Sequence, residues 1–297
     1  MKVNTMPGHL KNLIFKNKLT IRLLYVLGFY GNRFRKKYNN FILSDEWRDR
    51  INKVCECPDN KSIPKVDQAG KIIGDIQLMH NGIKINFGSY YGIEMVRLLE
   101  LNSGIHEPQE ERVFAEVLKK IPQNATMIEL GSYWSFYSMW FQKEVKGAKN
   151  YMIEADYFSY LSGIYNFRLN NMKGNFTNAF VNRTSSHSNS TKSVCIDDFV
   201  KSNNMGYIHL LHSDIQGFEY EMLLGAKKTF DDLKVGFVFI STHSNDLHNK
   251  CLDWIREYNF NIIASANMDE SYSWDGVLIA AAPSIRDIPV LEISKRK

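Results

Sequence analysis

Short apolar runs alternate with amphipathic segments through the second half of the chain. Segments with helical spacing fill the gaps between most of these runs, for example 218–229 and 247–258. Strands that alternate with helices are typical of a doubly wound, mostly parallel sheet. The last two runs are joined by a short polar loop, so we expect them to pair as an antiparallel hairpin at the end of the sheet. The pattern therefore predicts an α/β, Rossmann-like fold with an antiparallel last strand, its seven strands being residues 126–130, 149–153, 175–181, 207–213, 235–241, 261–266 and 276–282.

Smaller elements are predicted on either side of the first strand. Residues 71–79 and 83–87 alternate apolar and polar positions around Asn81-Gly82, a strong two-residue turn, and so predict a β-hairpin. Residues 182–193, rich in Ser, Thr and Asn, predict a loop. Two further helices are expected before the sheet begins, at 93–101 and 108–121.

Charge is distributed unevenly along the chain. Residues 1–44 hold nine basic side chains and no Asp or Glu, whereas the other residues hold 28 basic and 32 acidic side chains, a net charge of −4. The basic and apolar arm either lies on an anionic membrane surface or packs its apolar side on its own domain, and the sequence leaves both open. Nucleic acid is not an expected partner, because the body is acidic and carries no RNA-recognition motif. We divide the chain into a basic helical arm (1–60), a hairpin and helix accessory region (61–104) and a main domain (105–297).

The sequence favours a cytoplasmic protein. Its longest apolar run, residues 23–30, is far shorter than the about 20 residues that a spanning helix needs, and no small-residue cleavage site follows it. The four cysteines form one C-x-C pair and two single residues, which fits neither a disulfide framework nor a zinc site. Peripheral association with a membrane through residues 1–44 and formation of an oligomer stay open.

Ligands of such sheets bind outside the carboxyl ends of the strands. After the first strand, the turn 129–135 has a single glycine, Gly131, followed by Tyr133 and Trp134, which would obstruct a pyrophosphate. A dinucleotide is therefore disfavoured, and a smaller nucleoside that carries a cation fits better. Glu154 ends the second strand 23 residues after Gly131, the place of an acidic residue that binds ribose hydroxyls. Asp156 is interpreted as the N-cap of the next helix.

Three further polar residues follow the fourth and fifth strands. His212 and Asp214 are two positions apart, and His243 follows the neighbouring strand, about 4.8 Å away. Two imidazoles and a carboxylate are able to hold one divalent cation, such as Mg or Mn. The alternative is that His212 is a buried, hydrogen-bonded histidine and His243 an ordinary loop residue. Asp275, before the last strand, either faces the same mouth or belongs to a turn.

Several short motifs together resemble those of the FkbM family. The motifs are Glu129-Leu130-Gly131-Ser132, Glu154, Cys195-Ile196-Asp197-Asp198-Phe199, and Ser213-Asp214-Ile215-Gln216-Gly217-Phe218-Glu219 followed by Leu224-Gly225-Ala226. The resemblance covers about residues 105–282 and implies a class I methyltransferase that uses S-adenosylmethionine. Residues 104–111 and 133–138 are similar to a subgroup associated with polysaccharide biosynthesis. Where the family usually has Asp-x-Glu-Gly, this chain has Gln216 in place of the Glu, which removes a charge.

The resemblance implies roles for residues of the predicted site. Glu129, Gly131 and Ser132 would hold the methionine part of the donor, and Glu154 its ribose. The full set that we expect to bind the donor is Glu107, Glu129, Gly131, Ser132, Tyr133, Trp134, Ser135, Glu154 and Asp214.

We expect the reaction to be O-methylation of a sugar hydroxyl on a glycan or glycan precursor. Such a hydroxyl is a weak acid, so His212 or His243 would act as the base, and Asp214 would orient it or bind a metal ion. The alternative is a catalytically inactive methyltransferase-like fold that serves as a glycan-binding or assembly module, for which Gln216 is the clue. The sequence does not distinguish a lipid-linked, nucleotide-linked or polymeric acceptor.

Overall fold

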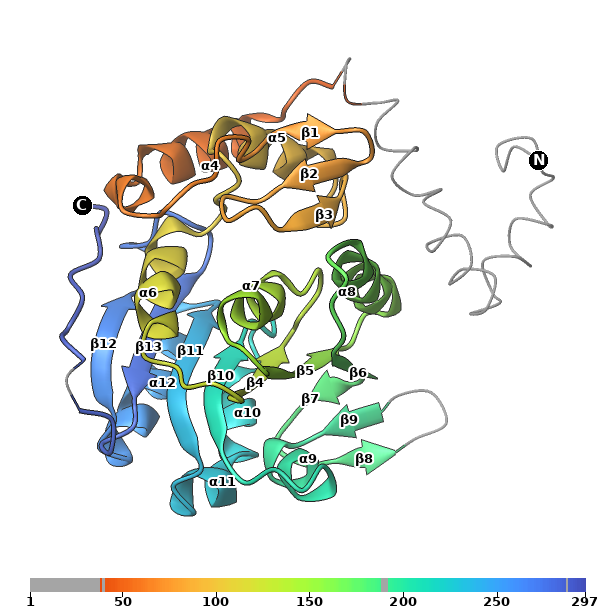
Figure 1. Cartoon of the computed structure of the whole chain (residues 1–297). Coiled ribbons are helices and arrows are strands. Elements are labelled where there is room, and N and C mark those ends of the chain that lie inside the picture. Colours follow the sequence, from red (N-terminus) through yellow and green to blue (C-terminus); the bar gives the residue numbers. More distant parts are fainter. Residues whose placement is uncertain (1–37, 39–40, 188–191, 287) are drawn as a thin grey trace.

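A central seven-stranded sheet organises the protein (Figure 1). The computed structural model describes residues 38, 41–187, 192–286 and 288–297. The strand order is β12-β13-β11-β10-β4-β5-β6, and β13 alone runs against its neighbours. The strands are β4 (Thr126–Leu130), β5 (Lys149–Glu154), β6 (Asn175–Asn178), β10 (Ile208–Ser213), β11 (Val235–Thr242), β12 (Asn261–Ala266) and β13 (Gly276–Ala281).

The predicted fold class is confirmed, and each of the seven apolar runs supplies one strand of this sheet. The third run, predicted as one strand over 175–181, is divided: residues 175–178 form β6, and residues 180–181 belong to a separate small sheet. The antiparallel pairing of the last two strands is present, with β13 inserted between β11 and β12. The expected helix 218–229 is divided into α10 (Glu219–Leu224) and α11 (Lys227–Asp231). The division has a physical cause, because the carboxylate of Asp197 accepts hydrogen bonds from the backbone N–H groups of Lys228 and Thr229 and so begins a new helix there.

Helices cover both faces of the sheet and bury a separate apolar core on each (Figure 1). Alternate residues of β11 divide between the two cores, with Phe237 and Phe239 in one and Val238 and Ile240 in the other. The first core is covered by α6 (Pro108–Leu118), α7 (Phe136–Glu144) and α8 (Tyr157–Leu169). The second is covered by α9 (Ile196–Ser202), α10, α11 and α12 (Asn245–Glu257). Among the described helices, none is both long and apolar enough to cross a bilayer.

Two local expectations differ from the structure. Helix α6 ends at Leu118, before the polar residues 119–120 that the expected helix 108–121 included. The segment 182–193 is not a continuous loop, since β8 (Ser186–His187) and β9 (Lys192–Val194) form a small sheet with β7 (Phe180–Val181). A hydrogen bond of 2.8 Å between the hydroxyls of Ser186 and Ser193 joins the paired strands β8 and β9, so polar residues here form a strand pair rather than a coil.

The accessory region packs onto the same core as the main domain. In the structure this region also includes residues 41–60, which the sequence pattern assigned to the basic arm. It contains α4 (Asp45–Glu56), the 3-10 helix η2 (Pro58–Lys61), the three-stranded antiparallel sheet β1 (Ile72–Ile73), β2 (Ile76–Leu78) and β3 (Lys84–Asn86), and α5 (Ile93–Leu101). The predicted turn at Asn81-Gly82 joins β2 to β3, and a second turn divides the expected first strand of the hairpin into β1 and β2. Val54, Met79 and Leu98 of this region lie in one apolar cluster with Phe114 of α6. Residues 1–37 of the predicted basic arm lie outside the described residues.

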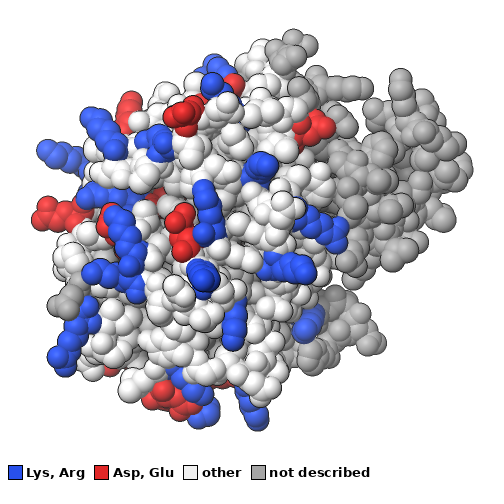
Figure 2. Space-filling model, viewed as in Figure 1, with Lys and Arg blue, Asp and Glu red and all other residues white. Residues whose placement is uncertain are grey.

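A buried ionic cluster joins the accessory region to the start of α6. The ring of His106 lies 2.6 Å from the carboxylate of Glu111 and 3.3 Å from that of Glu107. Glu111 also contacts His80, which belongs to the accessory region, at 3.2 Å. Burial alone would lower the pKa of His106, but the two carboxylates raise it to about 10. Several acidic side chains of the body are thus internal. On the face of the molecule drawn in Figure 2, Lys and Arg side chains are spread over the surface, and acidic side chains occur in few places.

The cluster makes stability dependent on pH in a defined direction. The pKa of His106 is about 10 in the folded protein and 6.5 in the unfolded chain, so its stabilising effect is complete below about pH 6.5 and is lost as the pH rises towards 10. Removing one partner of a buried ion pair costs about 3–5 kcal/mol. We expect His106→Gln to lower the free energy of unfolding by this amount near pH 6, and the difference from wild type to shrink steadily up to pH 10, as measured by urea denaturation.

His209→Gln is the matched control, because burial lowers the pKa of His209 instead of raising it. Its difference from wild type should stay constant between pH 6.5 and 10. A His106→Gln difference that is also constant over this range would contradict a protonated, paired His106.

Candidate functional site

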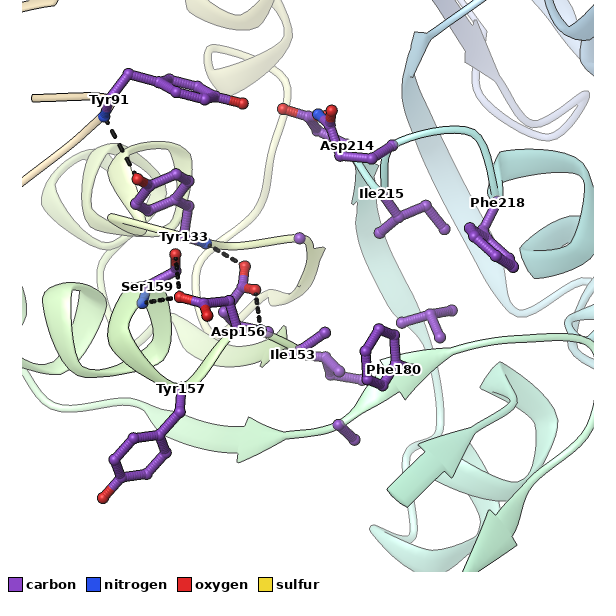
Figure 3. Close-up of a pocket in the computed structure, with 16 residues that line it drawn as sticks. Tyr91, Tyr133, Ile153, Asp156, Tyr157, Ser159, Phe180, Asp214, Ile215 and Phe218 are labelled. Atoms are coloured by element: carbon purple, nitrogen blue, oxygen red, sulfur yellow. Dashed lines mark hydrogen bonds between the residues drawn. The ribbon is translucent and has the colours of Figure 1, made fainter. Parts of the chain in front are cut away.

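A cavity of about 520 Å³ opens at the carboxyl ends of β4, β5 and β10 (Figure 3). Its walls come from the turn after β4, the start of α8, the segment between β6 and β7, and the loop after β10. Tyr91 of the accessory region closes one side. The lining residues are Tyr91, Gly131, Tyr133, Ile153, Glu154, Ala155, Asp156, Tyr157, Ser159, Ala179, Phe180, Val181, Asp214, Ile215, Gln216 and Phe218.

The turn after β4 is tightly constrained. Gly131 has φ +68°, and a Cβ at this position would overlap the carbonyl oxygen of Asp214, so only glycine fits. Its N–H donates to the carbonyl of Ile153 at 2.9 Å. Tyr133 and Ser135 have φ of 40° and 60°, in the left-handed region that is costly for residues with a side chain. Two residues with strained backbone thus occur in this one turn beside the cavity.

Ser132 does not cap the helix that follows this turn, although its position allowed that role. The N-cap of α7 is Ser135, whose side chain makes no capping hydrogen bond. The hydroxyl of Ser132 is buried and has no hydrogen-bond partner among the described residues.

Glu154 presents a fixed carboxylate to the cavity. One oxygen accepts from the backbone N–H of Tyr133 at 2.9 Å and the other from that of Asp156 at 2.7 Å. Burial raises the pKa of Glu154, and these two hydrogen bonds oppose the rise. Asp156 itself is the N-cap of α8, accepting from the N–H of Ser159 at 2.8 Å, which confirms that interpretation of the sequence. Both carboxylates are held in place by the backbone (Figure 3).

His243 lies beside Asp214, as the adjacency of β10 and β11 predicts. Its Nε2 is 3.3 Å from Asp214 Oδ1 and 3.4 Å from Asp275 Oδ1, so Asp275 faces the same mouth. Its Nδ1 is 2.9 Å from Glu219 Oε1. Burial would lower the pKa of His243, but Asp214, Glu219 and Asp275 raise it to about 10. The ring therefore carries a proton at neutral pH.

Glu219 supports this arrangement from inside the loop. The residue is fully buried, and its Oε1 accepts from the backbone N–H groups of Ile215 and Gly217 at 3.2 and 3.1 Å. One carboxylate thus fixes the loop that carries Asp214 and also contacts His243.

His212 has a different partner. Its Nε2 is 2.6 Å from Glu110 Oε1, and the other oxygen of Glu110 accepts from the hydroxyl of Ser241 at 3.0 Å. His212 is therefore a buried, hydrogen-bonded histidine, the alternative left open by the sequence. Within the described ranges, no group of three or more His, Cys, Asp or Glu side chains is arranged to hold a metal ion. The structure does not assemble His212, Asp214 and His243 as the predicted ligand set.

The residues predicted to bind the donor fall into two groups. Gly131, Tyr133, Glu154 and Asp214 line the cavity, whereas the other five lie outside its lining: Glu107, Glu129, Ser132, Trp134 and Ser135. Burial raises the pKa of Glu129 to about 7, and its carboxylate accepts from the backbone N–H of Ser138 at 3.1 Å. Burial would raise the pKa of Glu107, but contact with His106 brings it to about 2.

Aromatic residues near the turn mostly belong to the core. Trp134, Phe136 and Tyr137 are buried in the first apolar cluster, whereas Tyr133 lines the cavity. Sequence reasoning missed Phe180 and Phe218, which line the cavity with 53% and 49% of their surface exposed. Phe180 lies at the carboxyl end of the third predicted strand, 175–181, and this position is a signal that would have found it.

Several solved structures are similar to part of this chain. No curated protein matches the sequence. Solved structures with a similar fold include M. capricolum TrmK in complex with S-adenosyl-homocysteine (14% identity, 61% of this chain and 71% of that one, TM-score 0.41). A second is precorrin-6y C5,15-methyltransferase from Geobacter metallireducens GS-15 (11% identity, 59% and 89%, TM-score 0.43). A third is ribosomal protein L11 methylase from Lactobacillus delbrueckii subsp. bulgaricus (14% identity, 61% and 81%, TM-score 0.41).

The family model for the methyltransferase FkbM domain matches residues 113–262, about half of the chain. These residues run from the middle of α6 to the start of β12, so β13 lies outside the match, and they include Gly131, Glu154, Asp214 and His243. The chain therefore belongs to the FkbM methyltransferase domain family.

Proposed function

We propose that the protein is an S-adenosylmethionine-dependent O-methyltransferase that acts on a sugar hydroxyl of a glycan or glycan precursor. The observation that carries the proposal is the cavity itself. It brings the fixed carboxylate of Glu154 and the Asp214–His243 pair to the same edge of a methyltransferase-family sheet. The assignment of the acceptor to polysaccharide biosynthesis rests on the sequence resemblance.

The lining residues fit the donor. A volume of about 520 Å³ is within the range of small-molecule sites. Glu154, with both oxygens already oriented by the backbone, has lone pairs available for a ribose diol. Phe180 and Phe218 both line the cavity (Figure 3), where flat apolar faces suit a purine ring. When bound, S-adenosylmethionine would supply an electrophilic methyl group on a sulfonium.

The chain's own groups would orient the acceptor and take its proton. Transfer to a methyl carbon requires in-line positioning of a hydroxyl oxygen that is losing its proton. The carboxylates beside His243 keep its ring protonated. A positively charged ligand group bound at Asp214 would lower the pKa of His243, because like charges disfavour the protonated ring. The neutral ring would then serve as the general base that Asp214 orients.

Metal assistance remains a separate part of the proposal. His212, one of its three predicted ligands, is hydrogen-bonded to Glu110, so the steps above are assigned to Asp214 and His243 alone. Contact of residues 1–44 with an anionic membrane, which would bring the protein to lipid-linked glycans, and formation of an oligomer are also proposals.

A catalytically inactive, glycan-binding module is the second candidate. The observation that favours it is Gln216, which replaces a carboxylate usual in the family and whose amide donates to Asp214 at 3.1 Å. Binding of the donor distinguishes the two candidates.

Donor binding is tested by isothermal titration with S-adenosylhomocysteine. We expect wild-type protein to bind it, and Glu154→Gln to bind it about 10- to 100-fold more weakly, since a hydrogen bond to a charged group contributes about 1.5–3 kcal/mol. Glu257→Gln, an exposed change at the end of α12, is the matched control and should leave the affinity unchanged. Wild-type protein that does not bind at saturating ligand would favour the inactive module.

Catalysis is tested by transfer of labelled methyl groups to glycans extracted from the host. We expect His243→Gln to lower the turnover rate by about 10²- to 10⁴-fold, the usual contribution of a general base, while S-adenosylhomocysteine still binds. His209→Gln should remain active. Assays with EDTA, and with added Mg or Mn, test the metal. Full activity of His243→Gln would contradict the assignment of the base.

A further inference from the structure

Arg50 occupies an apolar position of α4. It shares the inner side of this helix with Trp47, Ile51 and Val54, at the spacing of an amphipathic helix. Only 2% of Arg50 is exposed, and Ile51 and Val54 beside it belong to the hydrophobic core. Arginine is almost never fully buried unless its charge is paired, so this position calls for an explanation.

The guanidinium packs against two indole rings that also contact each other, with centroids 5.1 Å apart. Its central carbon is 3.8 Å from the ring centroid of Trp274 and 4.9 Å from that of Trp47. These cation–π contacts do not provide hydrogen-bond partners for its N–H groups. Nε and Nη1 are both buried and have no hydrogen-bond partner, and no carboxylate of the described part of the chain lies within 4.0 Å of the guanidinium. Two donors at the edge of the group are thus unused.

Arg50 does not line the cavity itself, but its charge acts on residues of the site. Burial and the charge of Asp214 raise the pKa of Asp275, which contacts His243, to about 7, and the positive charge of Arg50 opposes this rise. The same charge contributes to the low pKa of Glu107, after the larger effect of His106. It acts in the same direction on Tyr91, which lines the cavity and points towards Asp214 (Figure 3). Arg50 therefore lies near both the cavity and the proposed base.

The charges of the site favour a singly charged, planar anion at Arg50. The cation of His243 is already surrounded by Asp214, Glu219 and Asp275. Arg50 is the neighbouring cation, and two of its N–H groups have no hydrogen-bond partner. A dianion such as phosphate would be repelled by the nearby carboxylates more strongly than a carboxylate would. The unused N–H donors point outward in the plane of the guanidinium, and a planar carboxylate binds a guanidinium in that plane.

We propose that Arg50 is a substrate-binding residue that holds a carboxylate at the mouth of the cavity. This inference rests on the proposed function. The carboxylate belongs either to the methionine part of the donor or to an acidic sugar acceptor. In both cases the accessory region supplies a binding residue that the methyltransferase domain lacks.

The test compares matched ligands with and without a carboxylate, by isothermal titration. S-adenosylhomocysteine is paired with 5′-methylthioadenosine, which lacks the amino-acid part, and glucuronate is paired with glucose. Each ligand is titrated into wild type, Arg50→Gln and Arg50→Lys, with Arg256→Gln on the exposed side of α12 as the matched control.

Two results would support the inference. If the donor supplies the carboxylate, Arg50→Gln weakens S-adenosylhomocysteine at least tenfold and leaves 5′-methylthioadenosine unchanged. If the acceptor supplies it, both nucleosides bind as before and glucuronate alone is weakened at least tenfold. Arg50→Lys, which keeps the charge but not the planar fork, should show the same selectivity with a smaller loss, and it replaces Arg50→Gln if that variant does not fold.

Other results would overturn the inference. If Arg50→Gln binds both carboxylate ligands as the wild type does, Arg50 has only a structural role, in which it packs against two indole rings. An equal loss of both members of a pair would indicate general damage to the site. Failure of the wild type to bind either nucleoside contradicts the proposed function, whereas the glucuronate pair still tests Arg50 without the donor. Wild type that binds none of the carboxylate ligands overturns the inference as well.

Discussion

The contact between Gly131 and the backbone of Asp214 is the constraint on which the site depends. The N–H of Asp214 donates to the carbonyl of Leu130 at 2.9 Å, which draws the end of β10 against the end of β4. No side chain fits at residue 131 under this contact. The turn on one side orients Glu154 through Tyr133, and the loop on the other carries Asp214 to His243. The Glu154 side and the Asp214 side of the cavity are thus fixed to each other by backbone rather than by flexible side chains.

The polar interior behind the turn has a complementary role. Glu107 and Glu111 share the cation of His106, Glu110 pairs with His212, and Tyr137 donates to Glu107 at 2.9 Å. Removing any one member would leave a buried charge without a partner, so the cluster has few alternative arrangements. It joins the start of α6 to the accessory region and to the sheet. The wall that carries Tyr91 and Arg50 is therefore held against the methyltransferase domain.

Sequence patterns gave the sheet and part of the site, for a physical reason. Parallel strands end at one edge, so residues that follow them, such as Glu154, Asp214 and His243, converge whatever the helices do. The partner of His212 did not follow from this argument, because Glu110 belongs to a helix whose packing on the sheet is not encoded in the strand pattern. Arg50 and Tyr91 were missed for the same reason. The apolar side of α4 did contain a signal, because a single charged residue, Arg50, occupies an apolar position there.

The reversed direction of β13 determines when the site is completed during synthesis of the protein. Because β13 runs against its neighbours, its first residues return to the edge where β10 and β11 end, and Asp275 and Trp274 arrive there with it. Trp274 then stacks on Arg50, more than 220 positions earlier in the chain. A ribosome-bound chain that has emerged only up to residue 262, where the family domain ends, already contains Arg50 but still lacks Trp274 and Asp275. The mouth of the site closes only when the last strand has left the exit tunnel, so incomplete chains carry an open site.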